Sequence, residues 1–206
     1  MLPWGIAEQR LATAVERANG RGSDGCGYLA ALAFAAMIRL DDVFAELGGF
    51  ALVEPARLSE FFEGKAQDQD LLTQFTTTPL GEQVLKDGIV VPLLGITPGY
   101  YRVTVRQASE SASIANPQVA SLGWVLRTIT GKLIVCGLGY LTQWNSEHPE
   151  HRHIEIEPGW YELQIQAGLL DSDDGDEEGI YELVLNKVPD RPAFTASTTQ
   201  SLSLFD

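Results

Sequence analysis

Three histidines and a glutamate stand close together in the second half of the chain. The stretch reads His148-Pro-Glu-His151-Arg-His153-Ile-Glu155. Alternate residues of an extended strand share a face, so His151, His153 and Glu155 point to the same side. Two imidazoles and a carboxylate suit Zn, Fe or Ni. Any solvent-facing strand with a two-residue period produces the same spacing, so the sequence predicts no metal and no cofactor. A metal site formed by these three residues is the alternative.

Cys26 is the second residue that could do chemistry. It lies between Gly25 and Gly27, just before an apolar stretch that begins at Tyr28. The N-terminus of a helix lowers the pKa of a thiol and activates the thiolate. With His151 or His153 as the base and Glu155 as the orienting group, the pattern resembles papain-like and related cysteine peptidases. The chain lacks the tryptophan or serine that those families carry near the cysteine, and a small residue in a tight turn explains Cys26 more simply. A cysteine hydrolase is therefore the alternative function.

Acidic residues gather between positions 171 and 182, where no basic residue interrupts them. A solvated hairpin loop, a cation-binding loop and a docking surface for a basic protein are three interpretations. The stretch departs from a calcium loop of the EF-hand type, because Gly175 and Asp176 are exchanged relative to that pattern and strands flank it. We expect partner binding by the acids of this loop and one acid of the preceding strand. They are Asp171, Asp173, Asp174, Asp176, Glu177, Glu178 and Glu162.

The whole chain is acidic, with 28 Asp and Glu against 14 Lys and Arg and a formal net charge of −14. Such a charge repels nucleic acid and anionic membranes and attracts a basic protein. The first four residues, Met-Leu-Pro-Trp, lack the basic start of a secretory signal, and the longest apolar run, 28–38, is too short to span a bilayer. The sequence therefore predicts a cytoplasmic protein with a basic protein partner, and it leaves the oligomeric state open.

One motif occurs twice in the second half of the chain. Residues 96–107 begin Ile-Thr-Pro-Gly-Tyr-Tyr and residues 156–167 begin Ile-Glu-Pro-Gly-Trp-Tyr, and both continue with alternating apolar and polar residues. Pro-Gly is a turn pair, and the alternation is the period of a half-buried strand. The motif predicts a hairpin that is used twice. If the second turn pairs residue 157 with residue 160, Glu155 lies opposite Glu162, which is an unfavourable pair of like charges.

The chain ahead of these strands is expected to be helical. Residues 5–18 have apolar residues spaced among charged ones as in an amphipathic helix, and residues 28–47 are rich in Ala and Leu. The second stretch is expected to form a buried central helix. Glu54-Pro55 predicts the start of a third helix, and residues 65–87 predict one or two more, with a break at 76–79.

From Gly88 onward the period changes to two, which predicts seven strands. They are 89–96, 100–107, 121–129, 132–142, 152–157, 160–167 and 180–187. Helices that come first and strands that follow indicate the α+β class. We expect an N-terminal helical segment packed on a C-terminal antiparallel β-sandwich or bent sheet of about seven strands. The expected domains are a helical region 1–87, a β region 88–190 and a Ser/Thr-rich tail 191–206, which is ordered only if other residues hold it.

Some strands and single residues carry further expectations. Strands 89–96 and 132–142 are apolar on both faces, so helices should cover the first and the second should be central. Cys136 should be an inert core residue. A third alternative function is sugar binding on an aromatic platform. Its residues would be Trp124, Trp144, Trp160 and Tyr100.

The segment 153–188, HIEIEPGWYELQIQAGLLDSDDGDEEGIYELVLNKV, resembles a widespread bacterial β-sandwich segment. In that pattern a Pro-Gly-x-Tyr-x-Val-x-Val strand precedes Gly-Leu-Asp, an acidic loop and a Glu-x-Tyr-x-Leu-x-Leu strand. Those proteins are mostly uncharacterised, and some look like immunity or inhibitor proteins. The resemblance implies no catalytic residue. We therefore expect an acidic, non-enzymatic binding protein, an immunity-type inhibitor that neutralises a basic toxin or nuclease-like effector.

Overall fold

The computed structural model describes residues 37–171 and 177–205. The chain divides into two compact units, Met1–Ala33 and Phe34–Asp206, and the described residues belong to the second. The helix predicted at 5–18 and Cys26 lie outside the described residues. The same holds for the first part of the helix predicted at 28–47.

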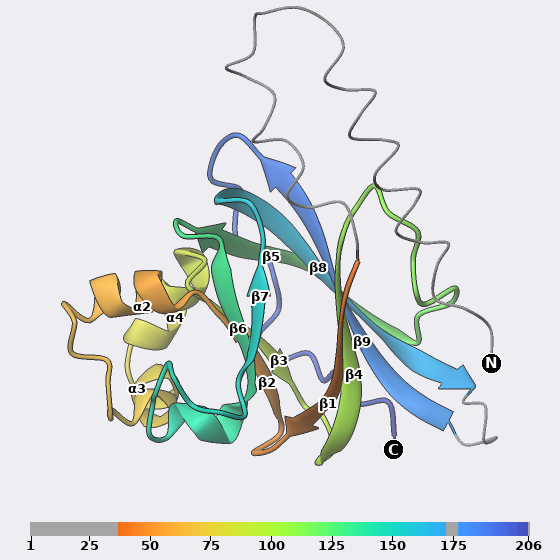
Figure 1. The fold of residues 1–206 in the computed structure, drawn as a ribbon, viewed down its shortest axis with the longest axis horizontal. Coiled ribbons are helices and arrows are strands. Elements are labelled where there is room, and N and C mark those ends of the chain that lie inside the picture. Colours follow the sequence, from red (N-terminus) through yellow and green to blue (C-terminus); the bar gives the residue numbers. More distant parts are fainter. Residues whose placement is uncertain (1–36, 172–176, 206) are drawn as a thin grey trace, which may run out of the picture. The chain divides into compact units, whose positions relative to one another are not determined.

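In the described residues, nine strands form two sheets (Figure 1). The five-stranded sheet has the order β1-β4-β9-β8-β5, and β4 and β9 run parallel while its other pairs are antiparallel. The four-stranded sheet has the order β3-β2-β6-β7 and is antiparallel throughout. The first sheet contains β1 (Ile38–Ala45), β4 (Gly99–Gln107), β5 (Val119–Thr128), β8 (Gly159–Asp171) and β9 (Glu177–Val188). The second contains β2 (Gly49–Val53), β3 (Val90–Leu94), β6 (Lys132–Gly137) and β7 (Arg152–Glu155).

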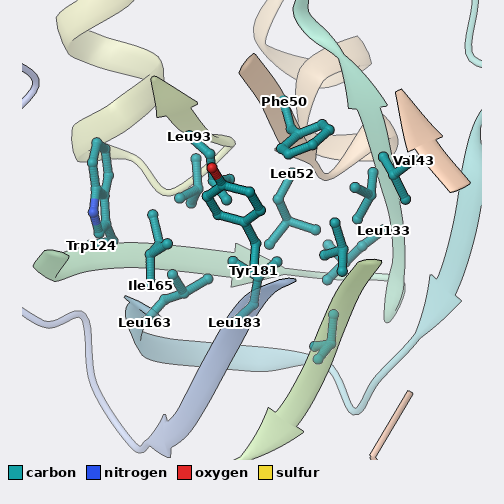
Figure 2. Packing of buried hydrophobic residues seen from close by; sticks show 14 of the residues in the cluster. Val43, Phe50, Leu52, Leu93, Trp124, Leu133, Leu163, Ile165, Tyr181 and Leu183 are labelled. Atoms are coloured by element: carbon teal, nitrogen blue, oxygen red, sulfur yellow. The ribbon is translucent and has the colours of Figure 1, made fainter. Parts of the chain in front are cut away.

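The two sheets share one hydrophobic core, which Figure 2 shows from close by. Phe50 and Leu133 enter it from the four-stranded sheet, and Leu163, Tyr181 and Leu183 enter it from the five-stranded sheet. The rings of Phe50 and Tyr181 meet edge to face at 5.6 Å. Alternation along each strand sends every second side chain into this core, which is why the period of two was visible in the sequence.

Three short helices pack on the other face of the four-stranded sheet (Figure 1). They are α2 (Pro55–Phe61), α3 (Leu71–Thr77) and α4 (Leu80–Lys86). Buried Leu58, Leu71 and Val84 join Val53 of β2 and Cys136 of β6 in a second hydrophobic cluster. The helices predicted after residue 54 and within 65–87 are confirmed, with the expected break between α3 and α4.

Glu54 ties this helical layer to the β5–β6 turn. The carboxylate is fully buried and accepts a hydrogen bond from the N–H of Arg57 as the N-cap of α2. It also accepts from the hydroxyls of Thr130 at 2.7 Å and of Thr128 at 3.3 Å. An N-cap side chain satisfies a helix N–H that has no intrahelical partner, so this carboxylate fixes where α2 begins.

The helix predicted at 28–47 is wrong for its second half. Residues 38–45 form β1, and β2 follows at 49–53 after a short turn. The pairing of β1 with β4 shifts register between Leu40 and Val43, where Asp42 has φ 55°. This bulge shifts the alternation by one residue and gives the segment a spacing that resembles a helix. The protein therefore has nine strands in its described part, and the expected domain ranges 1–87, 88–190 and 191–206 stay a prediction.

The seven strands predicted after residue 88 are all present with shifted ends. Strand β3 packs on both faces, as expected: Val91 and Leu93 lie in the shared core and Val90 lies in the helical cluster, while Pro92 and Leu94 are half-buried. Strand β6 lies inside its sheet between β2 and β7, but it ends at Gly137, and 138–141 form a 3-10 helix. The sheets are not wholly antiparallel, because β4 and β9 run side by side in the same direction.

Neither copy of the Pro-Gly motif forms the predicted hairpin. Each copy carries the chain from one sheet to the other, from β3 to β4 and from β7 to β8. The hydroxyl of Tyr101 donates to the carbonyl of Thr97 at 2.8 Å, and that of Tyr161 donates to the carbonyl of Glu157 at 2.6 Å. Both bonds join a core tyrosine to the residue four positions earlier, a geometry like that of the tyrosine corner of immunoglobulin-type domains. The repeat is therefore a crossover used twice.

The tail is held along the sides of both sheets. The N–H of Thr195 donates to the carbonyl of Gly123 in β5 at 3.0 Å, and the N–H of Leu202 donates to the carbonyl of Leu94 in β3 at 2.8 Å. Gly123 has φ +81°, and a Cβ there would lie 2.2 Å from the hydroxyl of Thr195. Only glycine lets Thr195 pack this close to the backbone, so the tail has a specific binding position on the edge of β5.

The segment between β4 and β5 covers an ion pair on the outer face of the five-stranded sheet. Nη2 of Arg106 lies 2.9 Å from Oε2 of Glu182, and the two side chains are 7% and 0% exposed. The other carboxylate oxygen of Glu182 accepts from the N–H of Ser113 at 2.7 Å, and Arg106 donates to the carbonyl of Glu110 at 3.0 Å. These charge-assisted bonds fix the segment to the sheet.

Candidate functional site

The acidic stretch of the sequence lies at the tip of the β8–β9 hairpin. The two strands pair over their whole length, from Trp160 opposite Val188 to Asp171 opposite Glu177. Asp173, Asp174 and Asp176 and the side chain of Asp171 lie outside the described residues. The register nevertheless places two acidic residues at directly paired positions, where like charges destabilise a sheet. The tip therefore has an electrostatic cost that a cation would relieve.

Arg102 of β4 contacts this tip from the neighbouring strand. Its guanidinium forms an ion pair with Glu178 and lies 3.3 Å from a carboxylate oxygen of Asp41 on β1. The carboxylate of Asp41 also accepts a hydrogen bond from Arg39 at 2.7 Å. This hydrogen bond and the charge of Arg39, followed by those of Arg102, hold the pKa of the Asp41 carboxyl below its usual range. In the described part of the tip, the carboxylate of Glu178 thus has an arginine partner.

Glu162 does not belong to the tip, although the sequence analysis grouped it with the acids of that loop. Glu162 lies opposite Asn186 on β9, whose amide donates to it at 3.1 Å. Asn186 lies nine positions after Glu177 in β9, which is roughly 30 Å along a strand. Glu155 lies in the other sheet opposite Lys132, so the predicted pairing of Glu155 with Glu162 is wrong.

The histidines form an aromatic cluster with the side chains that follow β6. His151 is 4% exposed and stacks on Trp144, with ring centroids 5.5 Å apart. Its ring also meets those of Tyr140 at 5.5 Å and His148 at 5.4 Å. Burial, followed by the charge of His148, lowers the pKa of His151 to about 4. At neutral pH His151 is therefore an uncharged packing residue.

The two alternative chemistries gain no support from this cluster. In 37–171 and 177–205, no group of three or more His, Cys, Asp and Glu residues is placed to hold a metal ion. Within the same residues, Glu155 makes no hydrogen bond to His151 or His153 that would orient a catalytic base. Cys26, the nucleophile of the hydrolase alternative, lies outside the described residues, and that alternative stays a prediction.

Cys136 is the inert core residue that the sequence predicts. It is 1% exposed in β6, and burial, reinforced by the charge of Glu46, raises the pKa of its thiol to about 12. A thiol with so little thiolate at neutral pH is a poor nucleophile and a poor metal ligand.

The aromatic platform for a sugar is wrong, because its four residues are dispersed. Trp124 and Trp144 are each 3% exposed and belong to different hydrophobic clusters. Trp160 packs against two guanidinium groups, those of Arg127 at 5.0 Å and Arg191 at 5.7 Å. Tyr100 alone is open to solvent, with 69% of its surface exposed, and it lies beside the acidic tip.

The comparisons with known proteins give a likeness of fold at a low level. No protein-family model matches this chain, and no curated protein matches it. A solved structure described as crocagin biosynthetic gene J is similar at 15% identity and a TM-score of 0.41, over 76% of this chain and 97% of that one. ComJ from Bacillus subtilis, described as an inhibitor of the DNA degrading activity of NucA, is similar at 7% identity and a TM-score of 0.43, over 76% of this chain and 98% of that one. Neither likeness transfers an activity.

None of the helices in the described ranges combines the length and the apolar character needed to cross a membrane.

Proposed function

We propose that this protein is a non-enzymatic, immunity-type inhibitor that binds a basic protein, such as a toxin or a nuclease-like effector, through the tip of the β8–β9 hairpin. The partner would present lysine or arginine side chains to the acids of 171–178. In an inhibited nuclease, carboxylates at this tip would occupy the positions that substrate phosphates otherwise take.

The observation that carries the proposal is the paired position of Asp171 and Glu177 at the end of a long hairpin. Six of the eight residues in 171–178 are acidic, and the chain as a whole carries a formal net charge of −14. A tip that gathers like charges is destabilised in isolation and stabilised by a cation, which favours a basic partner. ComJ inhibits a DNA-degrading activity, but the proposal for this chain rests on its own charges.

Co-expression in cells tests the proposal. The products of the genes that flank this one are each expressed with and without the full chain. We expect one product to be toxic alone and harmless with the chain, and to bind it with an affinity that falls steeply as salt is raised. The double substitution Asp173→Lys with Asp176→Lys should abolish the protection.

A control pair separates the tip from total charge. Glu63→Lys with Asp190→Lys makes the same change in net charge at two exposed positions outside 171–178. Protection that survives the control pair and is lost with the tip pair supports the proposal. Protection that survives both pairs, or binding that ignores salt, would refute the use of the acidic tip.

A further inference from the structure

An apolar hollow lies directly beside the acidic tip. It has a volume of about 360 Å³ and is lined by the start of β4, the start of β9 and the end of the tail. Pro98, Tyr100 and Phe205 form its apolar walls, and Glu177 and Glu178 stand among its lining residues. The parallel pairing of β4 with β9 brings these segments together, although they are far apart in the sequence.

Exposed aromatic side chains concentrate at this place. Among the phenylalanine, tyrosine and tryptophan side chains of the described part of the chain, those with more than about a third of their surface exposed are Tyr100 at 69%, Phe205 at 42% and Phe44 at 37%. Tyr100 and Phe205 line the hollow, and the ring of Phe44 lies 4.9 Å from that of Tyr100. Aromatic residues left open to solvent in one group mark a binding surface, because they lose water most favourably when a partner covers them.

The charges around the hollow indicate what kind of group it takes. The described residues that line it include two carboxylates and no lysine or arginine, and Arg102 contacts Glu178 from the neighbouring strand. A guanidinium group is planar, stacks on aromatic rings and forms paired hydrogen bonds with a carboxylate, whereas an ammonium group does neither as well. Aromatic walls beside carboxylates therefore suit arginine better than lysine.

We propose that this hollow receives an arginine side chain of the basic partner, with its guanidinium against Glu177 and its stem and plane on the rings of Tyr100 and Phe205. The proposal rests on the function proposed above and assigns its anchor point. The acids of the tip attract the partner over a distance, and the hollow selects one side chain at contact.

Peptide titrations on the full chain test the hollow. The probes are an alternating Arg-Gly octapeptide, the matching Lys-Gly peptide and an uncharged citrulline-Gly peptide, with binding followed by NMR shifts of the labelled protein. We expect the arginine peptide to bind most tightly and the citrulline peptide not at all. Tyr100→Ala and Phe205→Ala should each weaken the arginine peptide roughly fivefold and the lysine peptide less.

Matched variants identify what is responsible for binding. Leu122→Ala removes another exposed apolar side chain, 61% exposed on β5, and should change nothing. Glu177→Gln should weaken both basic peptides at least fivefold, whereas Glu162→Gln should have under a twofold effect, since roughly 30 Å is several screening lengths at 0.1 M salt.

The outcomes separate this inference from the proposed function. If Glu177→Gln and Glu162→Gln act equally and Tyr100→Ala is silent, the charge field alone binds the peptide, which overturns the hollow and leaves the inhibitor function standing. If Tyr100→Ala converts a dimer of the free chain into a monomer in sedimentation, a second copy is the occupant and the inference is wrong. Absence of any binding by the basic peptides, together with failure of the co-expression test, would refute both.

Discussion

Arg106 and Glu182 are an ion pair shielded from water, so replacing either residue alone should destabilise the protein strongly. With side chains 7% and 0% exposed, the loss of one partner leaves a buried charge, which costs about 3–5 kcal/mol. Glu182→Leu also frees the N–H of Ser113, which now donates to the carboxylate. We expect Glu182→Leu and Arg106→Met each to lower the free energy of unfolding by about 4 kcal/mol.

The double substitution should cost far less than the two single ones together. Arg106→Met with Glu182→Leu removes both charges and with them the desolvation penalty of several kcal/mol per ion. It loses the bonds of Arg106 to the carbonyls of Gln107 and Glu110 and that of Ser113 to the carboxylate. Each is worth about 1 kcal/mol net. The double variant should therefore lie within about 2 kcal/mol of the natural chain. The two single costs sum to about 8 kcal/mol, so the coupling between the residues should be about 6 kcal/mol.

Urea unfolding of the full chain, followed by tryptophan fluorescence, measures these values. The exposed pair of Lys86 and Glu82, with side chains 51% and 68% exposed, is the control, and its coupling should be small beside that of Arg106 with Glu182. If the single costs at Arg106 and Glu182 simply add in the double variant, the two residues do not stabilise each other and the reasoning fails.

Four more expectations follow from the same contacts. Glu54→Gln should cost about 2–3 kcal/mol in urea unfolding, because it takes a charged acceptor from buried donors, whereas Asp70→Asn at the exposed cap of α3 should cost clearly less; equal losses would contradict the role of burial. Tyr101→Phe and Tyr161→Phe should each cost about 1 kcal/mol, and a cost at only one would refute the equivalence of the two crossovers. Because the pKa of His151 is lowered to about 4, its neutral form stabilises the fold fully above pH 6.5, and up to about 3 kcal/mol is lost as the pH falls from 6.5 towards 4. His151→Phe should flatten that part of the pH profile, and an unchanged profile would contradict it. In a Cys26→Ser chain, Cys136 should react with a thiol reagent at pH 8 only after unfolding, and a fast native reaction would show that it is not buried.

The sequence predicts local structure well where one periodicity dominates. The helices after Glu54 and the strands after Gly88 are present because caps, turns and alternation act over a few residues. The segment 38–45 was mistaken for a helix because its bulge at Asp42 breaks the alternation. Strand β2, with five apolar residues buried on both faces, carries no period by which to distinguish it from a helix.

Strand partners were beyond what the sequence could show. A Pro-Gly pair predicts that the chain turns, and the apolar residues that follow it, such as Tyr161, predict which face of the outgoing strand is buried. Neither determines which sheet that strand joins. The acidic run and the histidines were visible as patterns. The hollow was not, because Phe44, Tyr100, Glu177 and Phe205 come from separate segments that only the completed sheet brings together.

The position of β9 in its sheet has a consequence for how the protein is made. This strand is the last of the nine along the chain, yet it lies between β4 and β8 in the middle of the five-stranded sheet. During synthesis the ribosome releases β1, β4, β5 and β8 first, and the place between β4 and β8 stays vacant until residues 177–188 emerge. Pairing of β4 with β9 joins residues about eighty positions apart, such as Arg102 and Ile180, and closing so long a loop slows folding. The acidic tip is thus completed only after β1, β4, β5 and β8 have been made, and a chain that stops before residue 177 lacks both the middle of the sheet and one side of the tip.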